Sequence, residues 1–217
     1  MDATKFRPYF RYAGLTVSKF ALGHFQVTKD MVFELRQLNY INQWKSILDN
    51  EWFHILLEDS SLFVFSSIDG KPSHSYYPCP LDFPSKRQFL SERGLENTQR
   101  NYLAVAEDYD LVRQTAPIKE FITPIRYDLD RSAYRRCAHP SAHLHIGWDN
   151  QIRIATRREF TPLAFILFVI RQVYPDNWER LFQEDKNLRL GEKLRTDLDE
   201  VIPPHWLPED EIQCYLY

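Results

Sequence analysis

The residues best suited to chemistry lie in one short stretch, HPSAHLHIG, which runs from His139 to Gly147. Three of the seven histidines of the chain fall within it: His139, His143 and His145. A histidine ring titrates near neutral pH and is also a common metal ligand, so such a cluster can serve acid–base chemistry or hold a metal. The alternative is a strand whose polar face happens to carry histidines.

The second part of this stretch alternates as a β-strand does. Because successive strand side chains point to opposite faces, the apolar side chains share one face and the histidines share the other. The apolar set, which we assign to the core, is Leu144, Ile146 and Trp148. We therefore expect His143, His145 and Gly147 to face outward or into a cleft.

The next apolar alternation, Ile152 to Arg157, predicts the partner strand of a hairpin. A three-residue turn at Asp149–Gln151 would place apolar opposite apolar, with Trp148 opposite Ile152. That register predicts these further pairs: His143 with Arg157, His145 with Ala155, and Gly147 with Arg153.

The segment before the histidines, Phe121 to Leu129, also reads as a strand. If it pairs with the histidine strand, Arg126 and Asp128 join the polar face and Tyr127 points to the core. The connection between the two strands is basic and carries Arg131, Arg135 and Arg136.

One chemistry that this face could perform is cleavage of a phosphodiester without a cofactor. His143 and His145 would act as general acid and base, and Asp128 would orient one of them. Three arginines, Arg126, Arg153 and Arg157, could bind phosphate and stabilise charge in the transition state. RNA is the partner that this hypothesis implies, held along its backbone by the basic connection.

A second hypothesis is a metal-dependent hydrolase that uses the same histidines. A His-x-His pair on a strand places both rings on one side, as in many zinc and iron sites. The candidate ligands are His139, His143, His145 and Asp128, with Glu107 or Asp108 as reserves. The nearby arginines argue against a divalent cation such as zinc at this position.

A third hypothesis is a non-catalytic module that binds or neutralises a partner protein encoded nearby. The acidic C-terminal part, with Pro203, Pro204 and Pro208, is its main support. This hypothesis predicts a stable complex, no cleavage and tolerance of histidine substitution.

The elements around these residues predict one α+β domain spanning 1–217, with a mainly antiparallel sheet of about five or six strands. We expect a helical part over 1–60, the sheet over 61–160, and a helical pair and an acidic tail over 161–217. Further strands are expected at Ser61–Ser67 and Leu103–Arg113, and an edge strand or loop at Ser75–Pro84. Thr161 and Pro162 are typical of a helix start.

Composition sets limits on the class of protein. The 217 residues are 44% hydrophobic and 15% aromatic, enough for a sizeable core, and the formal charge of −3 provides no strong global field. The three scattered cysteines and the absence of a signal-like start favour a reducing cytoplasm. The longest apolar run, Pro162 to Ile170, is too short for a membrane span and indicates a buried helix.

The motif Ile125-Arg126-Tyr127-Asp128, followed by the histidine stretch and the Thr161-Pro162 helix, resembles an uncharacterised bacterial family called domain of unknown function 2290. The resemblance covers about the second half of the chain and, more weakly, the rest. The same order of motifs is distantly similar to small clustered-histidine toxins of bacterial toxin–antitoxin pairs, which are shorter. That likeness implies a role in a defence locus, with RNA as the target. The residues that match are Arg126, Asp128, His139, His143 and His145.

Overall fold

The strands of the described residues form one sheet whose spatial order follows the chain from β1 to β8. The computed structural model describes residues 1–21, 25–148, 152–184, 190, 196–212 and 215–216. The strands are β1 (Val17–Phe20), β2 (Ile55–Leu57), β3 (Leu62–Ile68), β4 (Lys71–Tyr77), β5 (Ile125–Leu129), β6 (Ala142–Ile146), β7 (Ile152–Thr156) and β8 (Tyr215–Leu216). Neighbours pair antiparallel except β7 and β8, which are parallel. The α+β class is confirmed, and the sheet has eight strands among the described residues where five or six were expected.

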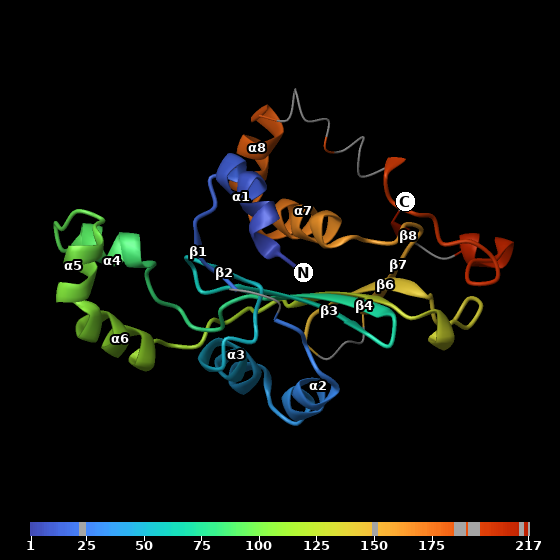
Figure 1. Cartoon of the computed structure of the whole chain (residues 1–217), viewed down its shortest axis with the longest axis horizontal. Helices are drawn as coiled ribbons and strands as arrows, with labels where there is room; N and C mark the ends of the chain where they lie inside the picture. The colour runs from blue at the N-terminus through green and yellow to red at the C-terminus, as the bar shows by residue number, and fades with distance from the viewer. Residues whose placement is uncertain (22–24, 149–151, 185–189, 191–195, 213–214, 217) are drawn as a thin grey trace.

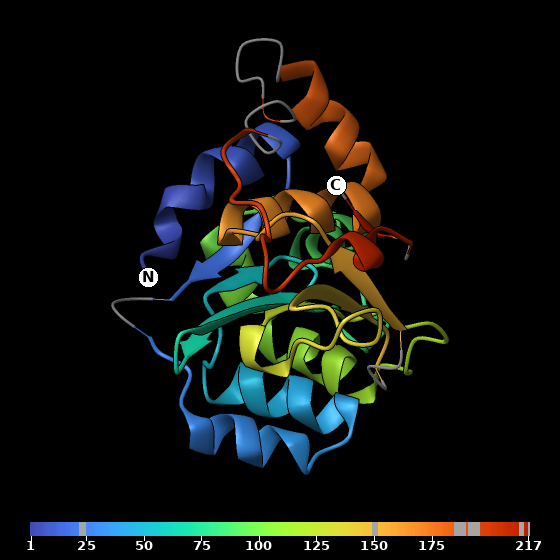
Figure 2. The same ribbon diagram turned by 90° about the vertical axis from the view of Figure 1, so that its right-hand side faces the viewer.

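Helices cover both faces of the sheet. They are α1 (Arg7–Ala13), α2 (Lys29–Arg36), α3 (Tyr40–Asp49), α4 (Lys86–Glu92), α5 (Gln99–Ala104), α6 (Ala106–Thr115), α7 (Pro162–Val173) and α8 (Pro175–Glu184). Helices α1, α7 and α8 lie on one face and α2 and α3 on the other, whereas α4 to α6 lie beyond one end (Figure 1). Figure 2 shows the same layers from a second direction, with α8 at the top and α2 at the bottom. No described helix is long and apolar enough to cross a membrane.

The face under α7 holds the main core. Helix α7 begins where expected: the Thr161 hydroxyl accepts a hydrogen bond from the Ala164 amide, and Pro162 occupies the first turn. Six of its side chains are buried, as predicted for the long apolar run. They pack on inward-facing aromatic residues of the sheet such as Phe63 and Tyr127, both fully buried.

The opposite face is only partly covered. Helix α3 packs on a small cluster that includes Trp44, Ile47 and Leu62. Helix α2 has no buried residue, although the Thr28 side chain caps it. Helix α2 therefore adds no buried residue to the core on this side.

Strand β4 is a central strand, although the sequence predicted an edge strand or loop at Ser75–Pro84. It pairs with β3 across a tight turn at Asp69 and Gly70, both with positive φ (53° and 73°), as a two-residue hairpin requires. It also pairs with β5. The prolines of the segment Ser75–Pro84 all lie after Tyr77, where the strand ends. Pro72 lies near the start of the strand.

Two other expectations about secondary structure were wrong. The segment Leu103–Arg113 lies in helices α5 and α6, where Glu107 and Asp108 occupy a first turn that favours acidic residues. The first 60 residues are not wholly helical, because β1 and β2 also form there. Strand β2 has only three residues, too few to show a period of two.

The hairpin of β6 and β7 is shifted by two residues. Trp148, which the alternation assigned to the core, is 42% exposed instead, because β6 ends at Ile146 and Gly147 (φ 91°) breaks the alternation. His143 pairs with Ala155, His145 with Arg153, and Ile146 with Ile152. The polar set therefore still faces one side, because a shift of two preserves the alternation. The expected turn at Asp149–Gln151 lies outside the described residues.

The C-terminal segment packs on its own chain. Val201 and Trp206 are buried in the main core, and β8 pairs with β7. The Asp210 carboxylate accepts hydrogen bonds from the Tyr134 hydroxyl (2.6 Å) and the Cys137 amide (2.8 Å). The expected helical pair before this segment, α7 and α8, is present.

Candidate metal centre and cleft

The predicted pairing of the Arg-Tyr-Asp strand with the histidine strand is confirmed. Asp128 on β5 lies opposite His143 on β6, and Arg126 lies opposite His145. Directly opposite residues on antiparallel strands point to the same face. The sheet thus brings these four side chains together on the face that α2 and α3 cover.

Three side chains of this group converge on one point. The Nε2 atoms of His143 and His145 are 3.0 Å apart, and His145 Nε2 is 3.3 Å from Asp128 Oδ2. One ligand atom from each of Asp128, His143 and His145 lies within 4.8 Å of the others. We call these three residues the trio.

The tautomer of His143 follows from its second nitrogen. His143 Nδ1 lies 3.0 Å from the carbonyl oxygen of Pro140, which can only accept, so Nδ1 carries a proton and donates. The neutral ring then presents a lone pair at Nε2. A ligating histidine commonly donates its other N–H to a carbonyl in this way.

Without a cation, the hydrogen bonds within the trio cannot all be well formed. His145 Nε2 faces two acceptors at once, the Nε2 lone pair of His143 and the Asp128 carboxylate, and a single N–H cannot point well at both. A metal placed among the three atoms would satisfy every lone pair. Tetrahedral coordination with metal–nitrogen distances of about 2.0–2.1 Å separates ligand atoms by roughly 3.3 Å. The two distances from His145 Nε2, 3.0 Å to His143 and 3.3 Å to Asp128, are close to this separation.

Burial keeps His143 neutral. Its side chain is 3% exposed, and burial, reinforced by the neighbouring His145, lowers its pKa to about 4. A neutral imidazole is the form that binds metals. The same neutrality makes His143 a weak general acid near pH 7.

Asp128 is ionised and firmly held. Burial alone would raise its pKa, but hydrogen bonds from His145 and Ser73 and the charge of Arg126 lower it well below the usual range. The Ser73 hydroxyl donates to Oδ1 at 2.7 Å and Arg126 Nε donates to Oδ2 at 2.8 Å. The carboxylate is thus oriented toward the histidines by two neighbouring groups.

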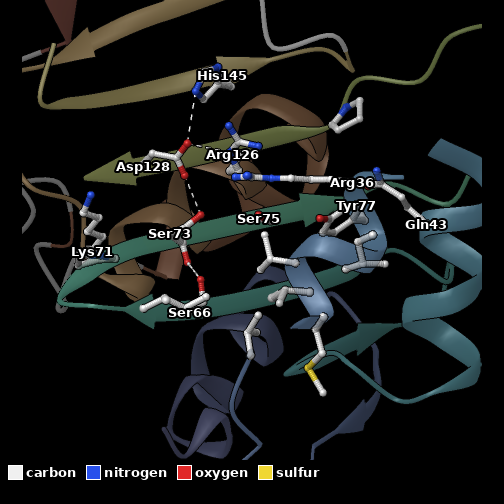
Figure 3. Close-up of a pocket in the computed structure, with 18 of the residues that line it drawn as sticks. Arg36, Gln43, Ser66, Lys71, Ser73, Ser75, Tyr77, Arg126, Asp128 and His145 are labelled. Atoms are coloured by element: carbon white, nitrogen blue, oxygen red, sulfur yellow. Dashed lines mark hydrogen bonds and ion pairs between the residues drawn. The ribbon is translucent and has the colours of Figure 1, made fainter. Parts of the chain in front are cut away.

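The trio lines a cleft between the sheet and the two helices that cover this face. The cleft has a volume of about 1250 Å³, and its floor carries Ser66, Ser73, Ser75 and Arg126 (Figure 3). Its helical wall includes Val32 and Leu35 of α2, and Arg36 extends from the same helix into the cleft toward Arg126 (Figure 3). Arg153 of β7 also lines it.

The arginines expected at this face are divided by the structure. Arg126 and Arg153 line the cleft, but Arg157 does not. The two-residue shift of the hairpin carries Arg157 past His143, where it donates to the carbonyl of Val201 and lies 3.8 Å from Glu200. It holds the C-terminal segment instead of a phosphate.

The basic connection is also engaged within the chain. Arg131 pairs with Glu159, and Arg136 pairs with Glu209 at 2.9 Å. Arg131 and Arg136 are thus neutralised by carboxylates, whereas Arg36, Arg126 and Arg153 line the cleft with the trio. Arg126 is the arginine that contacts the trio directly, and it does so through Asp128.

His139 lies beside the trio. Its ring packs edge-on against that of His143, with centroids 5.0 Å apart, and its Nδ1 is buried without a hydrogen-bond partner among the described residues. It lines the cleft but is not one of the three converging ligands. The reserve ligands Glu107 and Asp108 lie on α6, away from the cleft (Figure 1).

Sequence reasoning missed Ser73, Lys71 and Arg36. Ser73 and Ser75 alternate with His74 and Tyr76, a period-two signal that identifies β4 as a strand with a polar face. Lys71 lies on the same strand and pairs with Asp130 at 2.9 Å. No local pattern marks Arg36, because only the packing of α2 across the sheet brings it to the cleft.

Comparison with known proteins identifies the family. Residues 23–205 match the family described as "Uncharacterized conserved protein (DUF2290)", so the chain belongs to that family. The match extends well into the N-terminal half. No curated protein and no solved structure matches the chain.

Proposed function

We propose that this member of the family is a metal-dependent hydrolase of phosphoesters, with Asp128, His143 and His145 as the metal ligands. The observation that carries the proposal is the convergence of three ligand atoms at the floor of a cleft. His145 Nε2 lies 3.0 Å from His143 Nε2 and 3.3 Å from Asp128 Oδ2. Two imidazoles and one carboxylate suit zinc, iron or manganese. Three protein ligands leave coordination positions for water and substrate.

The residues around the trio supply the remaining requirements. A bound metal would lower the pKa of a coordinated water and polarise a phosphoryl oxygen. Ser73 and Arg126 hold the Asp128 carboxylate in place. Arg126 and Arg153 flank His145 on the neighbouring strands and are positioned to bind the other phosphate oxygens. In the reaction, water oxygen bonds to phosphorus, the ester P–O bond breaks, and the alcohol leaves with a proton from water.

The acid–base mechanism without a metal remains the second candidate, and the geometry favours it less. Such a mechanism needs one histidine on each side of the scissile phosphate. The two Nε2 atoms here contact each other at 3.0 Å, which leaves no room for a phosphate between them. The lowered pKa of His143, about 4, also disfavours its role as the acid.

RNA as the substrate and a role in a defence locus are predictions that the resemblance to toxins implies. A neighbouring protein as partner is the prediction of the binding-module hypothesis. The cleft supports RNA as the substrate through its cations, Arg36, Arg126 and Arg153. A binding module without catalysis is the third candidate. It predicts that substitution of the trio leaves the function intact.

The test is metal-dependent hydrolysis by protein stripped with a chelator and then reloaded separately with Zn²⁺, Mn²⁺ or Fe²⁺. The substrates are bis(4-nitrophenyl) phosphate and an RNA of mixed sequence. We expect at least one metal to restore cleavage in the wild type. His145→Ala and Asp128→Asn should lose it by about 100-fold or more, because each removes a ligand. His205→Gln, which alters a histidine outside the cleft, is the control.

Each alternative has its own outcome. Cleavage of RNA that persists after stripping but disappears in His143→Ala would support acid–base catalysis and contradict the metal mechanism. An absence of hydrolysis with every metal, together with a stable protein complex that the trio variants retain, would support the binding module.

A further inference from the structure

The cleft continues from the trio to an aromatic corner formed by Tyr40, Tyr77 and Trp148. All three residues line the same cleft as the trio. Tyr40 stacks on Tyr77 with centroids 6.3 Å apart and meets Trp148 edge-on at 5.3 Å. Tyr40 is buried, and its hydroxyl donates to the carbonyl of Pro78 at 2.6 Å, so it provides a fixed support for the Trp148 ring.

The Trp148 ring is open to a ligand. Its side chain is 42% exposed, an unusual exposure for a tryptophan that lines a cleft. The space beside it is also open, since a Cβ added to the adjacent Gly147 would meet nothing within 4 Å. An aromatic face that is supported on one edge and free elsewhere is suited to stacking.

Positive charge lies beside the trio. Arg126 and Arg153 flank His145 from the neighbouring strands β5 and β7. Gly147 follows directly after β6, two residues beyond His145, and its φ of 91° turns the chain so that Trp148 lines the cleft. Arg36 reaches toward Arg126 from α2 (Figure 3), and no carboxylate is paired with Arg36 or Arg153 among the described ion pairs.

We infer that the substrate is a nucleotide unit with an unpaired base, whose base stacks on Trp148 while its phosphate lies between Arg126 and Arg153 beside the trio. This inference rests on the proposed phosphoester hydrolysis and names its substrate class. The two arginines and the aromatic corner line one cleft, so a base and its own phosphate can contact both at once. Every nucleobase has a face that can stack, so the site selects for a nucleotide without selecting a sequence.

The walls of the cleft exclude a paired base. In a duplex the base faces are occupied by neighbouring bases, and a base must leave the stack to reach a protein pocket. Helices α2 and α3 lie over this face of the sheet (Figure 2). A base that stacks on Trp148 must therefore come from a single strand or a free nucleotide. A single strand and a free nucleotide present the same base and phosphate to the cleft. They differ in whether the phosphate continues into a nucleic acid chain.

The first experiment measures binding by calorimetry, without turnover. Its probes are adenosine 5′-monophosphate, ribose 5-phosphate, a single-stranded oligouridylate and an RNA duplex. We expect adenosine monophosphate to bind more tightly than ribose phosphate. Trp148→Ala should weaken binding of the nucleotide about 5- to 150-fold and leave that of ribose phosphate unchanged. Trp148→Phe should restore most of the loss, and Phe121→Ala, at an 81% exposed phenylalanine outside the cleft, is the control.

The second experiment separates this inference from the proposed function. Metal-loaded protein is offered a single-stranded oligonucleotide and an abasic oligomer of equal length. Faster cleavage of the base-containing strand, lost in Trp148→Ala, supports the inference. Equal cleavage of the two oligomers, or equal binding of adenosine monophosphate and ribose phosphate, overturns it while hydrolysis stands. If neither oligomer is cleaved with any metal, the proposed hydrolysis fails, and the calorimetric difference alone decides whether a base is bound.

The strand and free-nucleotide sources are distinguished by the same probes. Tighter binding of the oligouridylate than of adenosine monophosphate identifies a nucleic acid strand, and the reverse identifies a free nucleotide. Binding of the duplex as tightly as the single strand contradicts the requirement for an unpaired base.

Discussion

The two faces of the sheet differ in what their side chains do. The face under α7 is packed with aromatic rings such as Phe63 and Tyr127, and both are fully buried. The face under α2 alternates with it residue by residue, yet it carries Ser73, Asp128 and His143 in a cleft of about 1250 Å³. The same strands thus build a core on one side and a polar site on the other.

The contrast shows how a rigid site is built. A polar group that must not move is best placed on an element whose opposite side is locked by packing. Tyr127 anchors β5 in the core between the two cleft residues Arg126 and Asp128. We therefore expect core substitutions to change stability and cleft substitutions to change binding.

The largest expected effect on stability tests this contrast on a single strand. Phe63→Ala removes a fully buried ring that contacts Phe10 and Phe165 on the α7 side, and should lower the free energy of unfolding by about 3–5 kcal/mol. Val64→Ala, the next residue on β3 and part of the cleft wall, should cost about 1 kcal/mol or less. Urea unfolding measures both. Similar losses in the two variants would mean that the faces are not energetically distinct.

The next prediction concerns the group that orients Asp128. Ser73→Ala removes the 2.7 Å hydrogen bond to Asp128 Oδ1 and should weaken zinc or manganese binding about 10- to 100-fold. Ser75→Ala changes the next residue on the same strand face, beside Arg126, and should leave the affinity nearly unchanged. Metal titration with a competing chelator compares the two. Equal affinities in both variants would remove Ser73 from the account of the site.

The core side makes a prediction about pH. The Phe65 amide donates to Nδ1 of His54 at 3.1 Å, and burial lowers the pKa of His54 from 6.5 to about 4. Below pH 6.5 the unfolded chain binds a proton that the folded chain does not, so stability falls as the pH drops through this window. The loss should approach about 1.4 kcal/mol per pH unit from this residue.

His54→Gln should reduce that slope, because glutamine can accept the same hydrogen bond but does not titrate. The free energy of unfolding of wild type and variant is compared at pH 7 and 5.5, with His205→Gln as control. Parallel changes in all three proteins would show that His54 does not carry the pH dependence.

The smallest effect on stability is expected for helix α2, which lies over the cleft. Phe33 on α2 is 70% exposed, and Phe33→Ser should change the free energy of unfolding by less than about 0.5 kcal/mol. Because α2 buries no residue, its amides should exchange with solvent well before those of α7. Hydrogen exchange followed by mass spectrometry measures this order. Equal protection of the two helices would indicate that α2 is as firmly packed as the core.

The alternation of single strands predicted the centre of the site. His143, His145, Arg126 and Asp128 share a face as expected, because a period of two is a local property of the backbone. The helix that starts at Thr161 and Pro162 was predicted for the same reason, since capping is local.

The failures come from information that is not local. The register of β6 against β7 lies two residues away from the expected one, which removes Arg157 from the site. Arg36 approaches the cleft only through the packing of α2 over this face. Trp148 was assigned to the core, but the positive φ of Gly147 breaks the alternation and Trp148 lines the cleft. The prediction of a strand at Leu103–Arg113 was wrong because a short alternating run can also form a helix.

The most direct test of the central claim is a titration of the stripped wild-type protein with Zn²⁺ and Mn²⁺, followed by measurement of metal per chain after dialysis. We expect the three ligands to bind about one equivalent of one of these metals. His145→Ala and Asp128→Asn should lose it and His205→Gln should retain it. A wild type that holds no more metal than His145→Ala, under conditions in which both are folded, would contradict the assignment of Asp128, His143 and His145 as a metal site.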